Sequence, residues 1–291
     1  MVDAHLEGED WDEPHEAMAF ESSYGGVIET LKELVAGLRA AEAGEGPRPP
    51  HEELAARSRA LLVRAPALVN VMLNYKICAE HGLPLHPTVY YELAEARRYR
   101  LAYPIAEIER ANRLFRDSID LARAAYGLAG DFEARAEAFR SRLPPEVQDF
   151  VYTGTRDKYT WRASEPAKVR ALARVVREGF NPGLVVAAAH GSIMPGLLLA
   201  EYLDRPLYFL RFSMFKRKDE APILSIADEA WLAERSEERA LLFDEDVAKG
   251  TTLAIFAERL KHLFRESRTA CVIRHAGSGL RPDFAARTWW D

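Results

Sequence analysis

Cysteines, long apolar runs and secretory features are scarce in this 291-residue chain. Its two cysteines, Cys78 and Cys271, lie too far apart in sequence for a metal-binding knuckle, so we expect free core thiols and a reducing compartment. No run of about 18 apolar residues occurs, which predicts that no segment spans a membrane. The first twelve residues are acidic and lack an apolar stretch, so we expect no signal peptide there. These absences favour a cytoplasmic protein.

An excess of positive charge is also missing. Lysine and arginine number 39 against 45 acidic residues, which gives a formal net charge of −6. We therefore expect neither an extended nucleic-acid surface nor a nucleic-acid partner. Lysine is much rarer than arginine, yet Lys216, Lys218 and Lys249 all fall in the candidate site described below.

The first half of the chain is predicted to be helical. Residues 1–20 are acidic and aperiodic, and we expect a flexible tail. Over residues 21–155, apolar positions recur with helical spacing, as at Leu31, Leu34 and Val35. Beyond the first helix, which begins near residue 27, helices are predicted at about 52–63, 66–81, 88–101, 104–126 and 131–142. Because no alternating strand pattern precedes residue 150, this region is predicted to be an all-helical domain.

The second half, residues 156–291, alternates between strand and helix patterns. Apolar runs predict buried strands at 184–189, 206–212, 240–243 and 269–274, and helical patterns precede, separate and follow them. This alternation is typical of a parallel sheet with helices on both faces. The predicted fold class is therefore an α/β domain with flanking helices, preceded by the all-helical domain.

Two of the predicted strand ends carry polar, glycine-containing turns that lead into helices, and ligands bind at such ends in open parallel sheets. The stronger turn, residues 244–252, reads Asp-Glu-Asp-Val-Ala-Lys-Gly-Thr-Thr. Backbone amides of residues 249–252, together with both threonine hydroxyls, suit a phosphate at a helix N-terminus. The acids suit the two neighbouring hydroxyls of a ribose. The turn therefore predicts a site for a ribose that carries a 5-phosphate.

This turn resembles the signature of type I phosphoribosyltransferases, a hydrophobic strand followed by two acids, two or three variable residues and Thr-Gly-x-Thr. In the preferred alignment Asp244 and Glu245 match the acidic pair, and residues 249–252 match Thr-Gly-x-Thr with lysine in place of the first threonine. A second alignment takes Glu245 and Asp246 as the pair, with a loop one residue shorter. The resemblance implies that the 5-phosphate is bound by Ala248, Lys249, Gly250, Thr251 and Thr252.

Other parts of the family pattern follow in the same order over residues 184–291. His190, Gly191 and Ser192 resemble its pyrophosphate loop, with histidine where arginine or lysine is usual. The end of the next strand supplies a basic residue to pyrophosphate in the family, and Arg211, Lys216, Arg217 and Lys218 are the candidates here.

Two further stretches match the family downstream of these strands. Residues 219–238 take the place of the flexible hood loop. The segment 281–290 resembles the family's Pro-Asp-Tyr/Phe segment with its aromatic residues. That resemblance implies contacts of Asp283, Phe284 and Trp289 with the acceptor.

The resemblance implies an enzyme that transfers ribose 5-phosphate from phosphoribosyl pyrophosphate (PRPP) to a nucleobase or other small nucleophile, with release of pyrophosphate. It implies Mg²⁺ as cofactor, held by Asp244 and Glu245 directly or through ribose hydroxyls and water. Ala248 stands where purine members with a Glu-Asp pair carry an aspartate, so the acceptor stays open.

The helical half resembles no family. Residues 152–159 and Trp161 are candidates for a lid over the acceptor, and a structural or dimer-forming cap is the alternative. For the whole chain, a catalytically inactive PRPP- or nucleotide-binding regulatory protein of the same fold is a second hypothesis. A phosphohydrolase or nucleotide-binding domain that holds a metal directly through the acids is a third.

Overall fold

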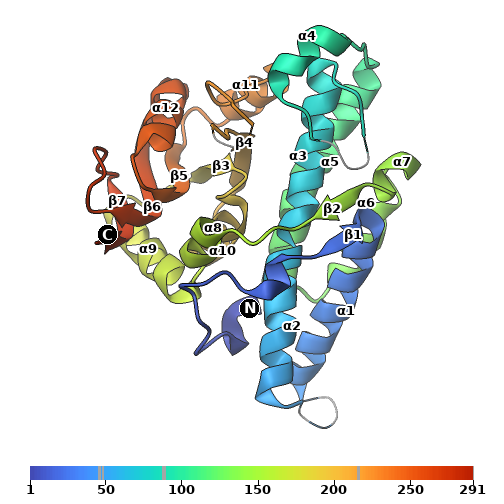
Figure 1. Ribbon diagram of the computed structural model, residues 1–291, viewed down its shortest axis with the longest axis vertical. Coiled ribbons are helices and arrows are strands. Elements are labelled where there is room, and N and C mark those ends of the chain that lie inside the picture. Colours follow the sequence, from blue (N-terminus) through green and yellow to red (C-terminus); the bar gives the residue numbers. More distant parts are fainter. Residues whose placement is uncertain (45–46, 48, 87–89, 215–216, 291) are drawn as a thin grey trace. The chain divides into compact units, whose positions relative to one another are not determined.

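The computed structural model describes residues 1–44, 47, 49–86, 90–214 and 217–290. These residues form two compact units (Figure 1). One unit contains residues 1–91 and 95–157, and the other contains residues 92–94 and 158–291. The predicted fold class is confirmed: a helical region precedes an α/β region with a parallel sheet.

The first unit is built around a buried helix, α3. Its helices are α1 (Tyr24–Ala43), α2 (His51–Arg64), α3 (Pro66–His81), α4 (Ala96–Tyr99), α5 (Ile105–Tyr126), α6 (Phe132–Arg140) and α7 (Pro145–Gln148). Helices α1, α2 and α5 all pack against α3. Almost every side chain of α3 is therefore buried, which explains why its sequence is apolar on all sides.

Three predictions for this region differ from the structure. Residues 1–20 are not an extended tail: they form the 3-10 helices η1 (Val2–His5) and η2 (Glu16–Met18), which pack against α2. A short antiparallel pair, β1 (Glu21–Ser23) with β2 (Val151–Thr153), occurs where only helix was expected. The helix predicted over 88–101 is reduced to η3 (Leu93–Glu95) and α4, while residues 87–89 lie outside the described residues.

The stretch His51–His81 is long and apolar enough to cross a membrane by composition. However, 89% of its most apolar window is buried inside the folded structure. This is the behaviour of a core helix pair in a soluble protein, because a spanning helix would turn that surface to lipid. The cytoplasmic location remains a prediction.

A buried ion pair lies between α3 and α5. The Lys76 ammonium lies 2.7 Å from a carboxylate oxygen of Glu80, and these side chains are 2% and 5% exposed. The other carboxylate oxygen of Glu80 accepts a hydrogen bond of 2.8 Å from the Asn112 amide. Opposite charges and a hydrogen bond thus compensate one another in the core of the helical unit.

The second unit contains a five-stranded parallel sheet within the described residues, in the order β4-β3-β5-β6-β7. Its strands are β3 (Leu184–Ala189), β4 (Leu207–Arg211), β5 (Arg239–Val247), β6 (Glu266–His275) and β7 (Phe284–Trp289). Its helices are α8 (Lys158–Ala163), α9 (Pro166–Gly179), α10 (Ile193–Leu203), α11 (Ile226–Ala233) and α12 (Thr251–Leu260), followed by η4 (Lys261–Leu263). Wholly buried β3 explains the uninterrupted apolar run 184–189.

The strand order reverses direction at β3 and β5. From β3 the chain passes through α10 to β4 on one side, whereas from β5 it passes through α12 to β6 on the other. Because such crossovers are right-handed, α10 and α12 lie on opposite faces of the sheet. The carboxyl ends of β3 and β5 therefore flank the crevice at which ligands bind in open parallel sheets.

Two strands and one helix of this unit differ from prediction. Strand β5 continues to Val247, so the three acids belong to the strand end and the turn proper is residues 248–250. Strand β7 was not predicted, because its side chains are only partly buried and show no apolar run. Helix α11 lies inside the segment expected to be a hood loop, and Ser225 with Asp228 forms a capping box at its start.

Candidate functional site

The site is built at the crevice between the carboxyl ends of β3 and β5. Residues 190–192 follow β3 and lead into α10, and the acids of β5 lie beside them. The Ser192 hydroxyl lies 2.7 Å from Glu245 Oε2 and 3.2 Å from Asp244 Oδ1. Since one hydroxyl carries a single proton, it can satisfy only one of these two carboxylates at a time.

Gly191 explains how closely the two strand ends approach. A Cβ atom at this position would lie 1.8 Å from Glu245 Oε1, so the carboxylate occupies the space that any larger residue would need. The Ala189–His190 peptide bond just before it is cis. The loop predicted to bind pyrophosphate and the predicted acidic pair are thus brought into direct contact.

The two acids are electrostatically unfavourable neighbours. Asp244 is 6% exposed. Its burial, together with the adjacent Glu245 carboxylate, raises the pKa of Asp244 well above its ordinary value. Neither acid has an ion pair with a basic side chain among the described residues. A group of like charges in a crevice is the kind of arrangement that functional sites maintain.

The turn after β5 has the backbone geometry of an anion site. Gly250 precedes α12 with φ +86°, and no side chain in the described structure caps the first amides of this helix. These amides and the helix dipole favour a bound anion. Lys249 is exposed next to them, and the Thr252 hydroxyl lies 3.7 Å from Met214 Sδ.

Glycine is required at position 250 for a second reason. An added Cβ would lie 2.3 Å from the Cβ of Leu280, which belongs to the connection between β6 and β7. Leu280 also packs against buried Val247, Leu253 and Cys271. The connection therefore lies against the turn and holds it from outside.

A second polar cluster, not identified from the sequence, lies at the carboxyl ends of β5, β6 and β7. His275 Nε2 lies 3.1 Å from Asp246 Oδ1. Burial raises the pKa of Asp246 to about 6, although His275 opposes this shift. Register places Trp289 opposite His275, and the Arg162 guanidinium lies 4.1 Å from the Trp289 ring centroid. Trp289 is thus near the site edge, as predicted.

The basic residues predicted for pyrophosphate have different positions. Arg211 is 2% exposed and its guanidinium lies 3.2 Å from Asp219. Lys218 is exposed, and its ammonium lies 3.4 Å from Glu92, which belongs to the same unit. Lys216 lies outside the described residues. Arg211 therefore ends β4 at the right edge of the sheet but is neutralised by an internal carboxylate.

Two predicted acceptor contacts are placed at the opposite edge. Phe284 pairs with Ala270 near the amino-terminal ends of β6 and β7. Asp283 accepts hydrogen bonds there from the amide and hydroxyl of Thr269, at 2.7 and 2.8 Å. These residues are corrected to a structural role, because the carboxyl edge is a strand length away. Trp161, proposed as part of a lid, is a fully buried core residue of α8.

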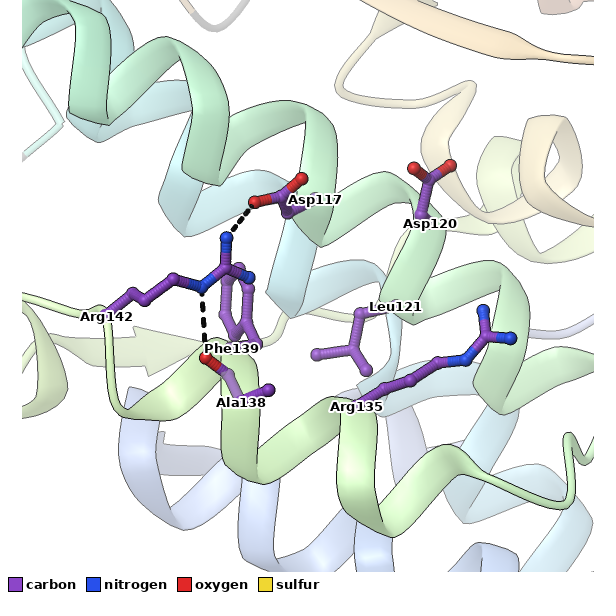
Figure 2. Close-up of a pocket in the computed structure, with 7 residues that line it drawn as sticks. All are labelled: Asp117, Asp120, Leu121, Arg135, Ala138, Phe139 and Arg142. Atoms are coloured by element: carbon purple, nitrogen blue, oxygen red, sulfur yellow. Dashed lines mark hydrogen bonds and ion pairs between the residues drawn. The ribbon is translucent and has the colours of Figure 1, made fainter.

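The helical unit has a groove of its own between α5 and α6, shown in Figure 2. Its floor is apolar, with Leu121 and Phe139, and its rim is charged. Rim residues Arg142 and Asp117 pair with each other at 2.6 Å, as the dashed line in Figure 2 shows. Arg135 on the same rim pairs with Asp131. Its arginines are thus compensated by neighbouring acids, unlike the acid pair of the crevice.

The residues that sequence reasoning missed needed knowledge of strand pairing. Asp246 is two residues from Asp244 and so lies on the same side of β5, a relation that the strand period gives once the strand is known to continue. Its partner His275 is 29 residues away and meets it only through the pairing of β5 with β6. Arg162 comes from a helix that precedes the sheet.

No protein-family model matches the chain, and no curated protein matches it. Solved structures match its C-terminal part. A purine phosphoribosyltransferase from Pyrococcus horikoshii is 23% identical over 44% of this chain and 83% of its own, with a TM-score of 0.35. The α/β unit is similar to phosphoribosyltransferases.

Two further matches have the same extent. The xanthine-guanine-hypoxanthine phosphoribosyltransferase of Helicobacter pylori is 18% identical over 41% of this chain and 77% of its own, with a TM-score of 0.32. A hypothetical protein from Neisseria gonorrhoeae with bound ppGpp is 20% identical over 44% of this chain and 81% of its own, with a TM-score of 0.37.

Proposed function

We propose that the chain is a phosphoribosyltransferase that takes ribose 5-phosphate from PRPP and passes it to a small nucleophile, releasing pyrophosphate. The observation that carries the proposal is the juxtaposition at the crevice of two like-charged buried acids with two uncapped helix N-termini. Helices α10 and α12 both begin there without a side-chain cap among the described residues. Two anion sites flanking an acidic pair match the chemistry of PRPP, which has phosphate groups at both ends of a ribose.

Each part of the crevice then has a role. The amides at the start of α12 and the hydroxyls of Thr251 and Thr252 hold the 5-phosphate. Asp244 and Glu245 accept hydrogen bonds from the ribose hydroxyls and stabilise positive charge that develops at C1 as its bond to pyrophosphate breaks. The amides of residues 190–192 stabilise the departing pyrophosphate. The sugar C1 then bonds to the acceptor nitrogen, which loses its proton.

The acid pair also fits Mg²⁺. Carboxylate oxygens suit this ion, and the raised pKa of Asp244 indicates that its negative charge lacks compensation. No group of three or more possible metal ligands occurs among the described residues. A magnesium ion would therefore need oxygens of the substrate as further ligands, and it would supply neutralisation of the pyrophosphate charge.

A specific observation keeps a regulatory function as the second candidate. Ala248 is exposed and offers no carboxylate to the acceptor, and the Glu245 carboxylate packs against Gly191. A protein that binds PRPP or a nucleotide in this pocket without turnover would need no such acid. Turnover therefore has to be measured directly.

The test is a pyrophosphate-release assay with PRPP and MgCl₂, screened over nucleobases, amines and other small nucleophiles. The proposal expects release with at least one acceptor, and loss of release in the double variant Asp244→Asn with Glu245→Gln. The double variant Glu52→Gln with Glu53→Gln is the matched control, because it removes two adjacent exposed acids of α2. Binding of PRPP without release for any acceptor would favour the regulatory candidate.

A further inference from the structure

One buried carboxylate closes the segment that follows β4 into a loop. Asp219 Oδ1 lies 3.2 Å from the Arg211 guanidinium, and Asp219 Oδ2 accepts a hydrogen bond of 2.9 Å from the Ser213 amide. Both members of the ion pair are 2% exposed. A single side chain thus holds the end of β4 and the start of the loop at the same time.

The backbone confirms that the loop returns to its starting point. The amides of Arg217 and Asp219 both donate to the Ser213 carbonyl, at 3.1 and 3.2 Å. Ile223 donates in turn to the Arg211 carbonyl at 2.9 Å. The chain between residues 213 and 219 is therefore fixed at both ends, with Asp219 as the only side chain among these contacts.

This loop lies beside both anion sites of the proposed enzyme. Arg211 pairs in register with Ala189, and Phe212 donates a hydrogen bond of 2.9 Å to the Ala189 carbonyl, directly before residues 190–192. On its other side Met214 contacts Thr252 of the 5-phosphate turn. Arg217 and Lys218 are carried within the closed loop and bring positive charge to the same edge of the sheet.

The charges explain which cations serve a ligand. Arg211 cannot give its full charge to a diphosphate while Asp219 neutralises it in a buried pair. Lys218 pairs only with Glu92 at the surface, and such exposed pairs are weak and easily exchanged. The ion pair inside the loop is thus structural, and the cations outside it are available for exchange.

We infer that Asp219 is a positioning residue for pyrophosphate: by clamping Arg211 and the Ser213 amide, it holds the loop with Arg217 and Lys218 against residues 190–192. This role rests on the proposed function. It differs from the prediction that Arg211 itself binds pyrophosphate, because here Arg211 acts as an internal anchor.

The experiment compares two probe ligands by calorimetry in the full chain with MgCl₂. Inorganic pyrophosphate reports on the loop, and ribose 5-phosphate reports on the turn at residues 248–252. Asp219→Asn should weaken pyrophosphate binding about tenfold, as expected for loss of a charged hydrogen bond, and leave ribose 5-phosphate binding unchanged. Steeper loss with added salt should not occur, since the basic residues remain but are misplaced.

Asp204→Asn is the matched control, because it makes the same change at an exposed position near the amino-terminal end of the same strand. Arg211→Lys keeps both buried charges and should give a weakening about threefold, so it tests the clamp even where Asp219→Asn folds poorly. Unchanged or tighter pyrophosphate binding in Asp219→Asn, with wild-type ribose 5-phosphate binding, overturns the inference alone. Failure of the wild type to bind either probe overturns the proposed function with it.

Discussion

The two units each bury a polar cluster, and the two clusters are built in opposite ways. In the helical unit Lys76, Glu80 and Asn112 satisfy one another between α3 and α5. In the α/β unit Asp244 and Glu245 face each other across Ser192, with no basic partner among the described residues. The first cluster maintains its own core, whereas the second retains an excess of negative charge that only a ligand or a metal can relieve.

This contrast separates stability from function in a way that single substitutions can test. Removing one charge from a compensated pair leaves the other charge buried, which destabilises the fold. Removing one of two like charges relieves repulsion, which does not. The largest effects on stability and on activity are therefore expected in different units.

The largest expected effect is on activity, in the α/β unit. Asp244→Asn should lower pyrophosphate release by about 10²- to 10³-fold, because it removes a carboxylate that stabilises charge at the sugar. Its melting temperature at pH 7 should equal or exceed that of the wild type, because a strained buried acid is gone. Parallel release assays and thermal melts measure both. A large fall in melting temperature would place Asp244 among structural residues instead.

The largest expected effect on stability is in the helical unit. Glu80→Ala leaves the Lys76 ammonium buried without this carboxylate and should reduce the free energy of unfolding by about 3–5 kcal/mol. Glu53→Ala, which breaks the exposed pair with Arg57 on α2, should cost less than about 1 kcal/mol. Urea unfolding followed by circular dichroism compares the two. Equal losses would show that burial of the pair is not what matters.

An intermediate effect is expected at the phosphate turn. Gly250 and Gly8 have nearly the same φ, +86° and +85°, but an added Cβ meets Leu280 at position 250 and nothing within 4 Å at position 8. Gly8→Ala should cost about 1–2 kcal/mol from backbone conformation alone. Gly250→Ala should cost about 1–3 kcal/mol more from overpacking and should weaken ribose 5-phosphate binding. Denaturant unfolding and calorimetry supply these values, and identical costs would argue against the contact with Leu280.

The smallest expected effect concerns pH. Burial raises the pKa of Asp246 to about 6, so the folded chain keeps a proton that the unfolded chain has lost above about pH 4. Stability from this group therefore falls as pH rises from about 4 to 6. Asp246→Asn should flatten that fall and gain a few degrees in melting temperature relative to the wild type across the window. A wild-type slope that persists in the variant would assign the effect to Asp244, whose pKa is raised by the same cause.

Local patterns in the sequence predicted the parts of the fold that depend on local chemistry. The apolar run 184–189 predicted β3, and the acids with Gly250 predicted where a ligand turn begins. The segment after residue 280 was read correctly only in part: Trp289 lies at the carboxyl edge, while Asp283 lies at the other. A motif gives the order of residues, but the strand between those two positions separates them.

Other features depend on contacts that no local pattern encodes. The apolar residues of 1–20 are irregularly spaced, so their packing against α2 left no periodic signal. Asp219 reads as an ordinary loop acid until its pairing with Arg211 is seen. Likewise, Asp246 and His275 become a pair only through the register of β5 with β6.

The contact between Gly250 and Leu280 also constrains how related chains can vary. Since the space beside the turn is filled by the residue at 280, a larger residue at 250 would be accepted only with a smaller one at 280, and φ near +86° would still favour glycine or asparagine. Substitutions at the two positions should therefore be correlated among homologous sequences, although 30 positions separate them. The evolutionary freedom of the phosphate turn is set partly by the segment that leads into the last strand.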